Sequence, residues 1–380
     1  MIARTLATLS VLACTSSLFG ADGLEGFGYP LFDGNTLAGW RVVGCEARVE
    51  SGAILLAEGD GVVVTDHRYS DFVLEVEWKA LGEEMWDSGI FFRCEMPPPE
   101  GRPWPRDYQV NLRKDMEGNV PGLAGAASRG LVKPGDWNHF RLTVVGATAS
   151  LEINGQPAWK ADGVERPSGH IALQSEVPGG GRFLFRNLRI KELGYRPLFN
   201  GVDLSGWTGA TAPAESCWKV EDGLLVCTGE KGTWLRHNDP VGDFNLRLEY
   251  RLKPGGNSGV YVRVPEEGSH HGNGSGIEVQ ILDDNHPRYT ELQPYQYSGS
   301  VYKIVPADPR VSRPAGEWNT LEINCQGPDY RVTHNGAVVV DAKGADIAEL
   351  LARCQQGYVG LQNHNEEVWF RHLRIGPPQP

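Results

Sequence analysis

Apolar and polar residues alternate along several short segments of the chain, which is the pattern of strands with one buried face. In residues 72–78 every second residue is apolar, ending at Trp78. Residues 141–145 and 149–153 flank a turn, and Asn154-Gly155 is a strong signal for a tight hairpin. Many short strands joined by such turns predict a β-sandwich or jelly roll.

One segment has helical spacing instead. Ile347, Leu350, Leu351 and Cys354 stand at positions i, i+3, i+4 and i+7. We therefore predict a short helix that packs on the second half of the protein before its last strands.

The chain repeats itself once, because five blocks of its first half return in the same order. They begin at Phe32, Asp71, Asp87, Gly135 and Phe185, and their counterparts begin at Phe199, Asp243, Asn257, Gly316 and Phe370. A period of this size is that of a whole domain. We predict two tandem sandwiches, residues 28–193 (copy 1) and 196–376 (copy 2).

Composition narrows the choice of function. Gly and Pro account for 48 and 25 of the 380 residues, well above their usual combined share of ~12% of a chain. This excess of helix-breaking residues excludes a helical bundle. The formal net charge of −12 argues against binding nucleic acid or an anionic membrane through bulk charge. The 11 Trp fit sandwich cores and sugar-stacking surfaces alike.

The N-terminus has the features of an export signal of about 21 residues: a short basic start and an apolar run too short to span a bilayer. We expect the mature protein to be periplasmic or extracellular. Residues 11–14 also resemble a lipobox, in which case Cys14 would carry a lipid anchor. The six later cysteines show no zinc or CxxC spacing, so disulfides and buried thiols both stay open, and we expect no cysteine catalysis.

Copy 2 contains an ordered set of short blocks: residues 198–201, 204–207, 218–223, 257–260, 276–284, 316–319 and 360–362. In this order they resemble the bacterial family of 3-keto-glucoside 1,2-lyases / 3-keto-2-hydroxy-glucal hydratases, also called 3-keto-disaccharide hydrolases. Copy 1 resembles the family more weakly. The resemblance implies an all-β fold of two tandem concanavalin-like jelly-roll sandwiches.

The resemblance also implies a reaction. The C3 keto group of a 3-keto-glycoside acidifies the C2 hydrogen, a base removes it, the C1 aglycone leaves, and water adds to the glucal. Such a site needs a base, a group that stabilises the enolate and a proton donor. No Rossmann fingerprint occurs, so we expect no nicotinamide or flavin here, and a separate sugar 3-dehydrogenase must supply the keto substrate.

Strand parity suggests which residues take part, because residues two apart on a strand share a face. Glu278 and Gln280 lie opposite the apolar Ile277, Val279 and Ile281. By the same rule Asn257, Gly259, Tyr261 and Arg263 share a face, as do Gln362 and His364. Our hypothesis is Glu278 as base, Arg263 or His364 as enolate stabiliser, and His286, His364 or Tyr302 as proton donor.

Substrate contacts are expected from Asn257, Tyr261, Gln280 and Gln362, with Trp218 as the sugar platform. Asp283 and Asp284 either shape a turn or, with Glu278, could bind a divalent cation through oxygens. His270-His271 lies among Gly and Ser and favours a flexible loop over a metal site.

The copies differ at the proposed base. Aligning them places Gln109 opposite Glu278 and Asn111 opposite Gln280. Since a glutamine cannot act as a carboxylate base, copy 1 has lost the reaction or moved it to Asp107 or Glu176. A packing role and a binding role both stay open for it.

Two other functions compete with the lyase. One is a non-catalytic, lectin-like sugar-binding protein. The other is a conventional glycosidase, which needs two carboxylates ~5–9 Å apart. Glu278 has no acidic neighbour at i+2 or i+4, which argues weakly against the glycosidase.

Overall fold

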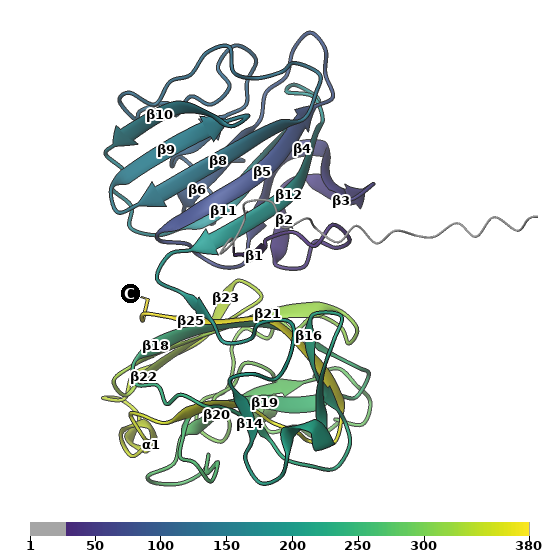
Figure 1. The fold of residues 1–380 in the computed structure, drawn as a ribbon, viewed down its shortest axis with the longest axis vertical. Helices are drawn as coiled ribbons and strands as arrows, with labels where there is room; N and C mark the ends of the chain where they lie inside the picture. Colours follow the sequence, from purple (N-terminus) through teal and green to yellow (C-terminus); the bar gives the residue numbers. More distant parts are fainter. Residues whose placement is uncertain (1–27, 380) are drawn as a thin grey trace, which may run out of the picture.

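The computed structural model describes residues 28–379, which form two β-sandwiches stacked end to end (Figure 1). The all-β prediction of two tandem jelly-roll sandwiches is confirmed. The export signal and Cys14 lie outside the described residues. None of the described helices is long and apolar enough to cross a membrane.

Copy 1 contains twelve strands in one continuous hydrogen-bonded system. They are β1 (Tyr29–Pro30), β2 (Trp40–Val43), β3 (Glu46–Glu50), β4 (Ala53–Thr65), β5 (Phe72–Ala80), β6 (Gly89–Cys94), β7 (Gln109–Asn111), β8 (Asn138–Val145), β9 (Thr148–Ile153), β10 (Gln156–Asp162), β11 (His170–Val177) and β12 (Phe183–Glu192). The long β4 joins both layers, because its first half pairs with β3 and β12 and its second half with β2 and β11.

Copy 2 contains thirteen strands in two separate sheets, ordered β15-β16-β25-β18-β21-β22-β23, with β13 on β25, and β14-β17-β24-β19-β20. They are β13 (Arg196–Pro197), β14 (Trp207–Gly209), β15 (Trp218–Glu221), β16 (Leu224–Thr228), β17 (Leu235–His237), β18 (Phe244–Leu252), β19 (Asn257–Val264), β20 (Ile277–Leu282), β21 (Trp318–Gln326), β22 (Asp329–His334), β23 (Ala337–Ala342), β24 (Tyr358–Leu361) and β25 (Glu367–Gly376). We call the second of these the five-stranded sheet.

Short helical turns complete copy 2: η1 (Ala214–Ser216), η2 (Pro294–Gln296) and α1 (Ala348–Leu351). The predicted helix is therefore a single turn. Leu350 is buried in the core, but Leu351 is 59% exposed and Ile347 is extended, so the apolar spacing does not continue as a helix.

Each copy has its own apolar core between its two layers. Alternate residues of the five-stranded sheet, such as Val260 and Val262 in β19 and Val279 in β20, point into the core of copy 2. Full burial of a side chain of this size contributes about 1.5–3 kcal/mol. The six cysteines within the described residues are free thiols, and four of them are buried.

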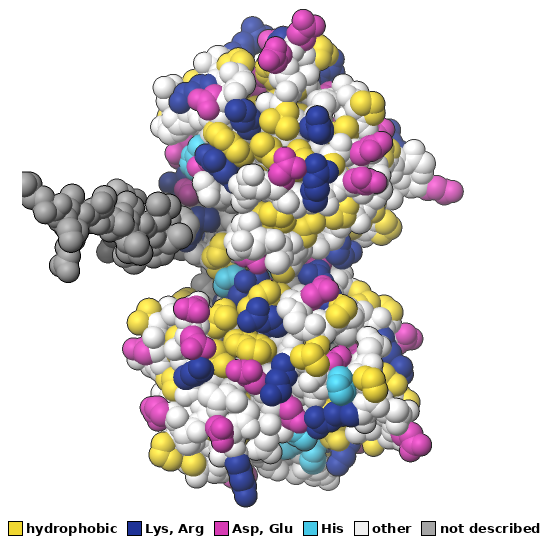
Figure 2. All heavy atoms as spheres, turned by 90° about the vertical axis from the view of Figure 1, so that its right-hand side faces the viewer, with side chains coloured by type: hydrophobic (Ala, Val, Ile, Leu, Met, Phe, Trp, Pro, Cys, Tyr) yellow, Lys and Arg dark blue, Asp and Glu magenta, His cyan; other side chains and the backbone are white. Residues whose placement is uncertain are grey.

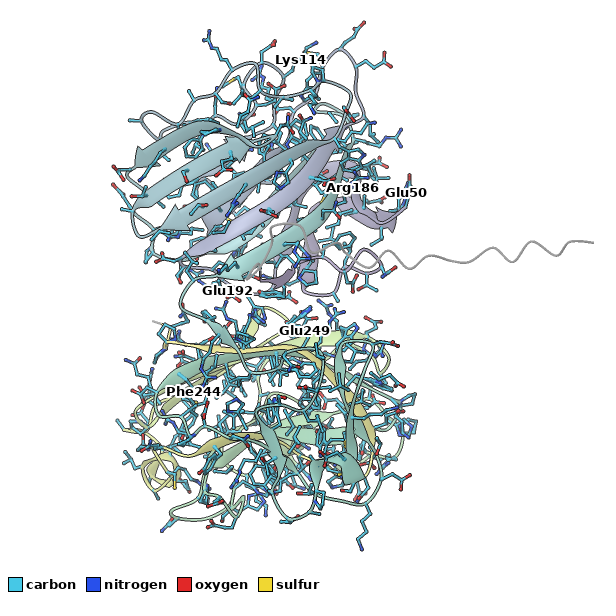
Figure 3. All side chains as sticks on the ribbon, in the orientation of Figure 1. Glu50, Lys114, Arg186, Glu192, Phe244 and Glu249 are labelled. Atoms are coloured by element: carbon cyan, nitrogen blue, oxygen red, sulfur yellow. The ribbon has the colours of Figure 1, made fainter. Side chains whose placement is uncertain are left out.

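The junction between the copies is held by buried charges. Glu192, at the end of β12, forms ion pairs with Arg247 of β18 and Arg374 of β25. Figure 3 places Glu192 and Glu249 where the two sandwiches meet. Charges of this kind are seldom buried without partners, so the two copies depend on each other here.

A second part of the junction involves the end of copy 1 strand β4. The carboxylate of Asp66 accepts hydrogen bonds from Arg313 Nη2 at 3.2 Å and Thr320 Oγ1 at 3.1 Å. His67 Nδ1 lies 3.0 Å from Glu322 Oε2. The face shown in Figure 2 narrows at this junction, and acidic and basic side chains are mixed over both copies there.

Candidate functional site

Glu278 stands on the face of the five-stranded sheet that is turned away from the core. In β20 its flanking residues Ile277 and Val279 are core residues, so the parity argument holds for this strand. Across the sheet Glu278 pairs with Tyr261 of β19, and Gln280 pairs with Gly259. Tyr261, Glu278 and Gln280 therefore lie together on one face, and Asn257 lies half-buried at the start of β19.

The carboxyl group of Glu278 is almost completely buried, with the residue 3% exposed. Gly259 makes room for it, because a Cβ at Gly259 would collide with Glu278 Oε1. Burial raises the pKa of Glu278 to about 8, although a hydrogen bond from Gln362 and the charge of Lys303 oppose the rise. A carboxyl group that titrates near neutral pH is suited to acid–base chemistry.

Two histidines from the loop between β19 and β20 cover this carboxyl. His270 Nε2 lies 3.3 Å from Glu278 Oε2, and its ring stacks on Tyr261 with the centroids 4.5 Å apart. His270 Nδ1 lies 3.1 Å from the carbonyl oxygen of Gly268, to which it donates. This fixes the tautomer and leaves the Nε2 lone pair facing Glu278.

His271 adds a second imidazole ring beside His270 and Glu278. Its ring lies 3.9 Å from that of His270 and 5.5 Å from that of Tyr302. Burial lowers the pKa of His270 and lowers that of His271 to about 4, so both rings are neutral at pH 7. His270-His271 does lie in a loop, as expected, and this loop brings both rings to the predicted base.

The donor atoms of His270, His271 and Glu278 lie within 4.8 Å of one another, close enough for a divalent ion to gather them. Asp283 and Asp284 do not contribute. Asp283 accepts from the Gly255 amide, and Asp284 accepts from Ser298 and Ser312. Their role is to shape the turn after β20, and the oxygen-ligand hypothesis for them is wrong.

Aromatic rings border the site on both sides. Trp234 packs edge-on against Tyr261 with the ring centroids 5.4 Å apart, and Tyr295 packs edge-on against Tyr302. Gln362 Nε2 donates to the Tyr261 hydroxyl at 3.1 Å, while Gln362 Oε1 is buried without a donor among the described residues. An unpaired buried acceptor beside a reactive carboxyl is a natural contact for a substrate hydroxyl.

Arg263 is not part of this site. Its backbone is left-handed, with φ of 54°, and the pairing of β19 with β24 shifts register there, so the side chain turns to the core. Its guanidinium bonds Asp243 and the carbonyl oxygens of Gly242 and Gly327. The residue is 0% exposed, and its predicted role as enolate stabiliser conflicts with this placement.

His286 and His364 also lie elsewhere. His286 follows the far end of β20 and contacts Arg288 and Tyr289. His364 is exposed and bonds Glu366, which pairs with Arg288 at 2.9 Å. The two histidines thus belong to a surface cluster around Arg288, and of the predicted proton donors only Tyr302 lies beside Glu278.

Trp218 is a core residue rather than a sugar platform. It is 1% exposed, its Nε1 donates to the Thr233 carbonyl at 2.9 Å, and its ring packs on Phe370. Trp234, to which the sequence pattern assigned no role, packs on Tyr261, the cross-strand partner of Glu278.

The domain model described as "3-keto-alpha-glucoside-1,2-lyase-like domain" matches residues 29–191 and again residues 194–376. The chain belongs to this family. A 3-keto-disaccharide hydrolase of Bacteroides thetaiotaomicron is 27% identical over 233 residues, covering 48% of this chain and 78% of that protein.

Solved structures include two from Parabacteroides distasonis, each described as a "putative glycosyl hydrolase". One has 22% identity and a TM-score of 0.43, covering 49% of this chain and 95% of its own. The other has 26% identity and a TM-score of 0.41, covering 48% and 98%.

The two 3-keto-glucoside-lyase-like domains can be matched strand by strand. Phe91 pairs with Gln109 across β6 and β7 just as Tyr261 pairs with Glu278, so the alignment of Gln109 with Glu278 agrees with the strand register. Gly89 packs on Gln109 as Gly259 packs on Glu278. Copy 1 therefore keeps the geometry but holds an amide where copy 2 holds the carboxyl.

Arg263 has a counterpart in copy 1 as well. Arg93 has φ of 47° and bonds Asp71 and the carbonyl oxygens of Ser70 and Gly146. Because Arg93 and Arg263 have equivalent partners in both copies, their common role is to support the fold of this domain.

Proposed function

We propose that copy 2 cleaves 3-keto-glycosides by elimination, with Glu278 as the base. Membership of the family supports a carbohydrate-active, hydrolase-like domain. The observation that carries the finer assignment is the buried Glu278 carboxyl against the Nε2 lone pair of His270, on a polar face bordered by Trp234 and Tyr302.

In the proposed reaction the Glu278 carboxylate takes the C2 proton of the sugar. The C–H electrons form the enolate at C2 and C3, whose collapse restores the C3 ketone, creates the C1=C2 double bond and expels the aglycone oxygen. That oxygen takes a proton. Water then adds across the double bond, with hydroxyl to C1 and hydrogen to C2.

Neighbouring groups support these steps. Lys303 supplies positive charge that acts on Glu278, and it replaces Arg263 as the cation for the enolate. Tyr302, whose ring lies between those of His271 and Tyr295, is the proton donor in this proposal. Export through the N-terminal signal and supply of the keto sugar by a separate dehydrogenase belong to the same proposal.

A conventional glycosidase is favoured less. It requires a second carboxylate close to Glu278, and the influences on the pKa of Glu278, which are burial, Gln362 and Lys303, include no acidic group. The lectin-like alternative does not require a reactive buried carboxyl.

The test is to assay the protein on a nitrophenyl 3-keto-glucoside beside the plain nitrophenyl glucoside. We expect release from the keto substrate alone, and loss of about 10²–10⁴-fold in rate for Glu278→Gln. Glu152→Gln, an exposed strand glutamate of copy 1, is the matched control and should keep full activity. Release from the plain glucoside would contradict the lyase.

Treatment with a chelator separates two uses of the same side chains. Activity that survives it supports the acid–base pair of His270 and Glu278. Activity that is lost and then restored by Zn²⁺ or Mn²⁺ would make His270, His271 and Glu278 metal ligands instead.

A further inference from the structure

Copy 1 has a pocket at the position that corresponds to the Glu278 site. Its volume is about 400 Å³, and its floor includes Phe91, Gln109 and Gln174. Gln109 corresponds to Glu278 by strand register, and Phe91 to Tyr261. Ser88 Oγ donates to the Gln174 carbonyl as Ser258 Oγ donates to that of Gln362, which makes Gln174 the counterpart of Gln362.

The amides on this floor are held in a fixed order. Gln109 Nε2 donates to Gln174 Oε1, and Gln174 Nε2 donates to Glu176 Oε2 at 3.1 Å. These two hydrogen bonds orient the Gln109 amide. Its Oε1 accepts no hydrogen bond from the described residues. The pocket therefore offers an oriented acceptor for a hydroxyl group, as sugar-binding sites do.

An immobilised aromatic ring forms one wall. Trp104 is only partly buried, and its Nε1 donates to the Ser175 carbonyl at 2.9 Å, which holds the indole in place. The ring packs on the apolar patch that includes Phe91 and leaves part of its surface to the pocket. A fixed indole with an exposed face can stack on a sugar ring at little cost in conformational entropy.

The charge at the rim is positive. Arg102 and Arg106 line the pocket and have no ion-pair partner among the described residues, whereas Asp107 is neutralised by Arg166 at 2.7 Å. A second pocket of about 510 Å³ shares Arg106 and Asp107 with the first. Together the two can accept more than one sugar unit.

We propose that copy 1 is a non-catalytic binding site for an acidic glycan, which stacks on Trp104, bonds Gln109 and places its anionic group at Arg102 and Arg106. The carbohydrate class rests on the function proposed for copy 2, whereas the acidic group rests on the arginines. The anion can be a uronic carboxylate or a sulfate ester, and guanidinium groups recognise both.

The test is isothermal titration calorimetry with the full chain carrying Glu278→Gln, so that turnover does not interfere. Cellobiose, a glucose–glucuronic acid disaccharide and sulfated cellobiose are the probes. We expect the two acidic probes to bind at least tenfold more tightly than cellobiose. Whichever acidic probe binds more tightly identifies the source of the anion.

Three variants in the Glu278→Gln background locate the site. Trp104→Ala should weaken binding about tenfold or more, and Arg106→Ala, at an exposed position, should remove the preference for acidic probes. Trp234→Ala, in copy 2, should leave this binding unchanged. Binding that is insensitive to Trp104→Ala and Arg106→Ala, equal binding of cellobiose, or no binding would overturn the proposal.

The outcome can be separated from that of the proposed function. Turnover of the 3-keto-glucoside by the wild-type chain reports on copy 2, and we expect Trp104→Ala to leave that turnover unchanged. A protein without turnover that still binds acidic glycans through Trp104 would refute the lyase but not this site.

Discussion

At the scale of single residues, Glu278 faces two opposing demands. Its buried environment favours the neutral carboxyl, whereas proton abstraction requires the carboxylate. Because the pKa of Glu278 lies at about 8, both forms are accessible near neutral pH. The neutral His270 ring, with its lone pair turned to the carboxyl, allows the proton to be shared rather than lost to solvent.

The role of Glu278 as base predicts how the rate of the reaction depends on pH. Since the base is the deprotonated form, kcat/KM for the 3-keto substrate should increase with pH and level off above an apparent pKa of about 8. Initial rates between pH 5.5 and 9.5 measure this. A rate that falls above pH 8 would instead make Glu278 the proton donor of a glycosidase.

Ionisation of the buried Glu278 carboxyl should lower the stability of the fold as the pH rises towards 8. The carboxyl pKa is about 8 in the folded state and ~4.3 when unfolded, so between these values the unfolded chain binds fewer protons. Stability from this group therefore falls as the pH rises from about 4.5 to 8. We expect Glu278→Gln to melt at a higher temperature than the wild type at pH 8, and with little difference at pH 4, by calorimetry.

At the scale of elements, the sequence predicts one strand well and its neighbour only in part. The strict alternation in β20 correctly placed Glu278 and Gln280 opposite the core. The same rule failed at Arg263, because a single left-handed residue in β19 reverses the side on which its side chain points. A bulge of this kind leaves no mark in the pattern of apolar residues.

Residues brought to the site by loops could not be placed from periodicity. His270 and His271 reach Glu278 through the loop of residues 265–276, whose path depends on its packing against Tyr261. Their only sequence signal was the adjacency of two histidines. The choice between Trp218 and Trp234 likewise depends on which sheet face each ring meets, which alternation at a strand end does not reveal.

Arg263, at the bulge of β19, gives a prediction at the scale of elements. Arg263→Met should lower stability, because it removes the guanidinium and leaves the carbonyl oxygens of Gly242 and Gly327 without their donor, at a cost of about 1–3 kcal/mol each. Rates per folded molecule, measured well below the melting temperature, should stay near the wild-type value. A large fall in kcat with stability unchanged would restore Arg263 to the catalytic group. Arg93→Met is the matched control in copy 1 and should show a similar loss of stability.

At the scale of the whole molecule, the two sandwiches are joined through charged groups rather than apolar surface alone. Burial by itself would raise the pKa of Glu322, but the charge of Arg247 and the hydrogen bond with His67 outweigh it and hold the pKa below its usual range. Glu192 has a lowered pKa for the same reason, with Arg374 and Arg247 as its partners. Arg247 thus serves two carboxylates, Glu192 from copy 1 and Glu322 from copy 2.

Removing that arginine should uncouple the copies. In Arg247→Met both carboxylates lose a partner in a buried site, at a cost of about 3–5 kcal/mol. Because each copy has a separate core, we expect a single melting transition in the wild type to split into two in differential scanning calorimetry. Lys219→Met, which breaks an exposed pair with Glu221, should leave the wild-type profile unchanged. One transition in Arg247→Met would show that the junction does not depend on these charges.

The amide that copy 1 holds beneath Gly89 has a practical meaning for enzymology. Gln109 has the shape of the protonated glutamate it matches, and it keeps the equivalent cross-strand pairing and the same close approach to a glycine. The chain thus contains its own isosteric substitution, already accommodated by the equivalent pair of strands in copy 1. A loss of turnover in Glu278→Gln can therefore be attributed to the missing acidic oxygen rather than to a scaffold unable to accept the amide.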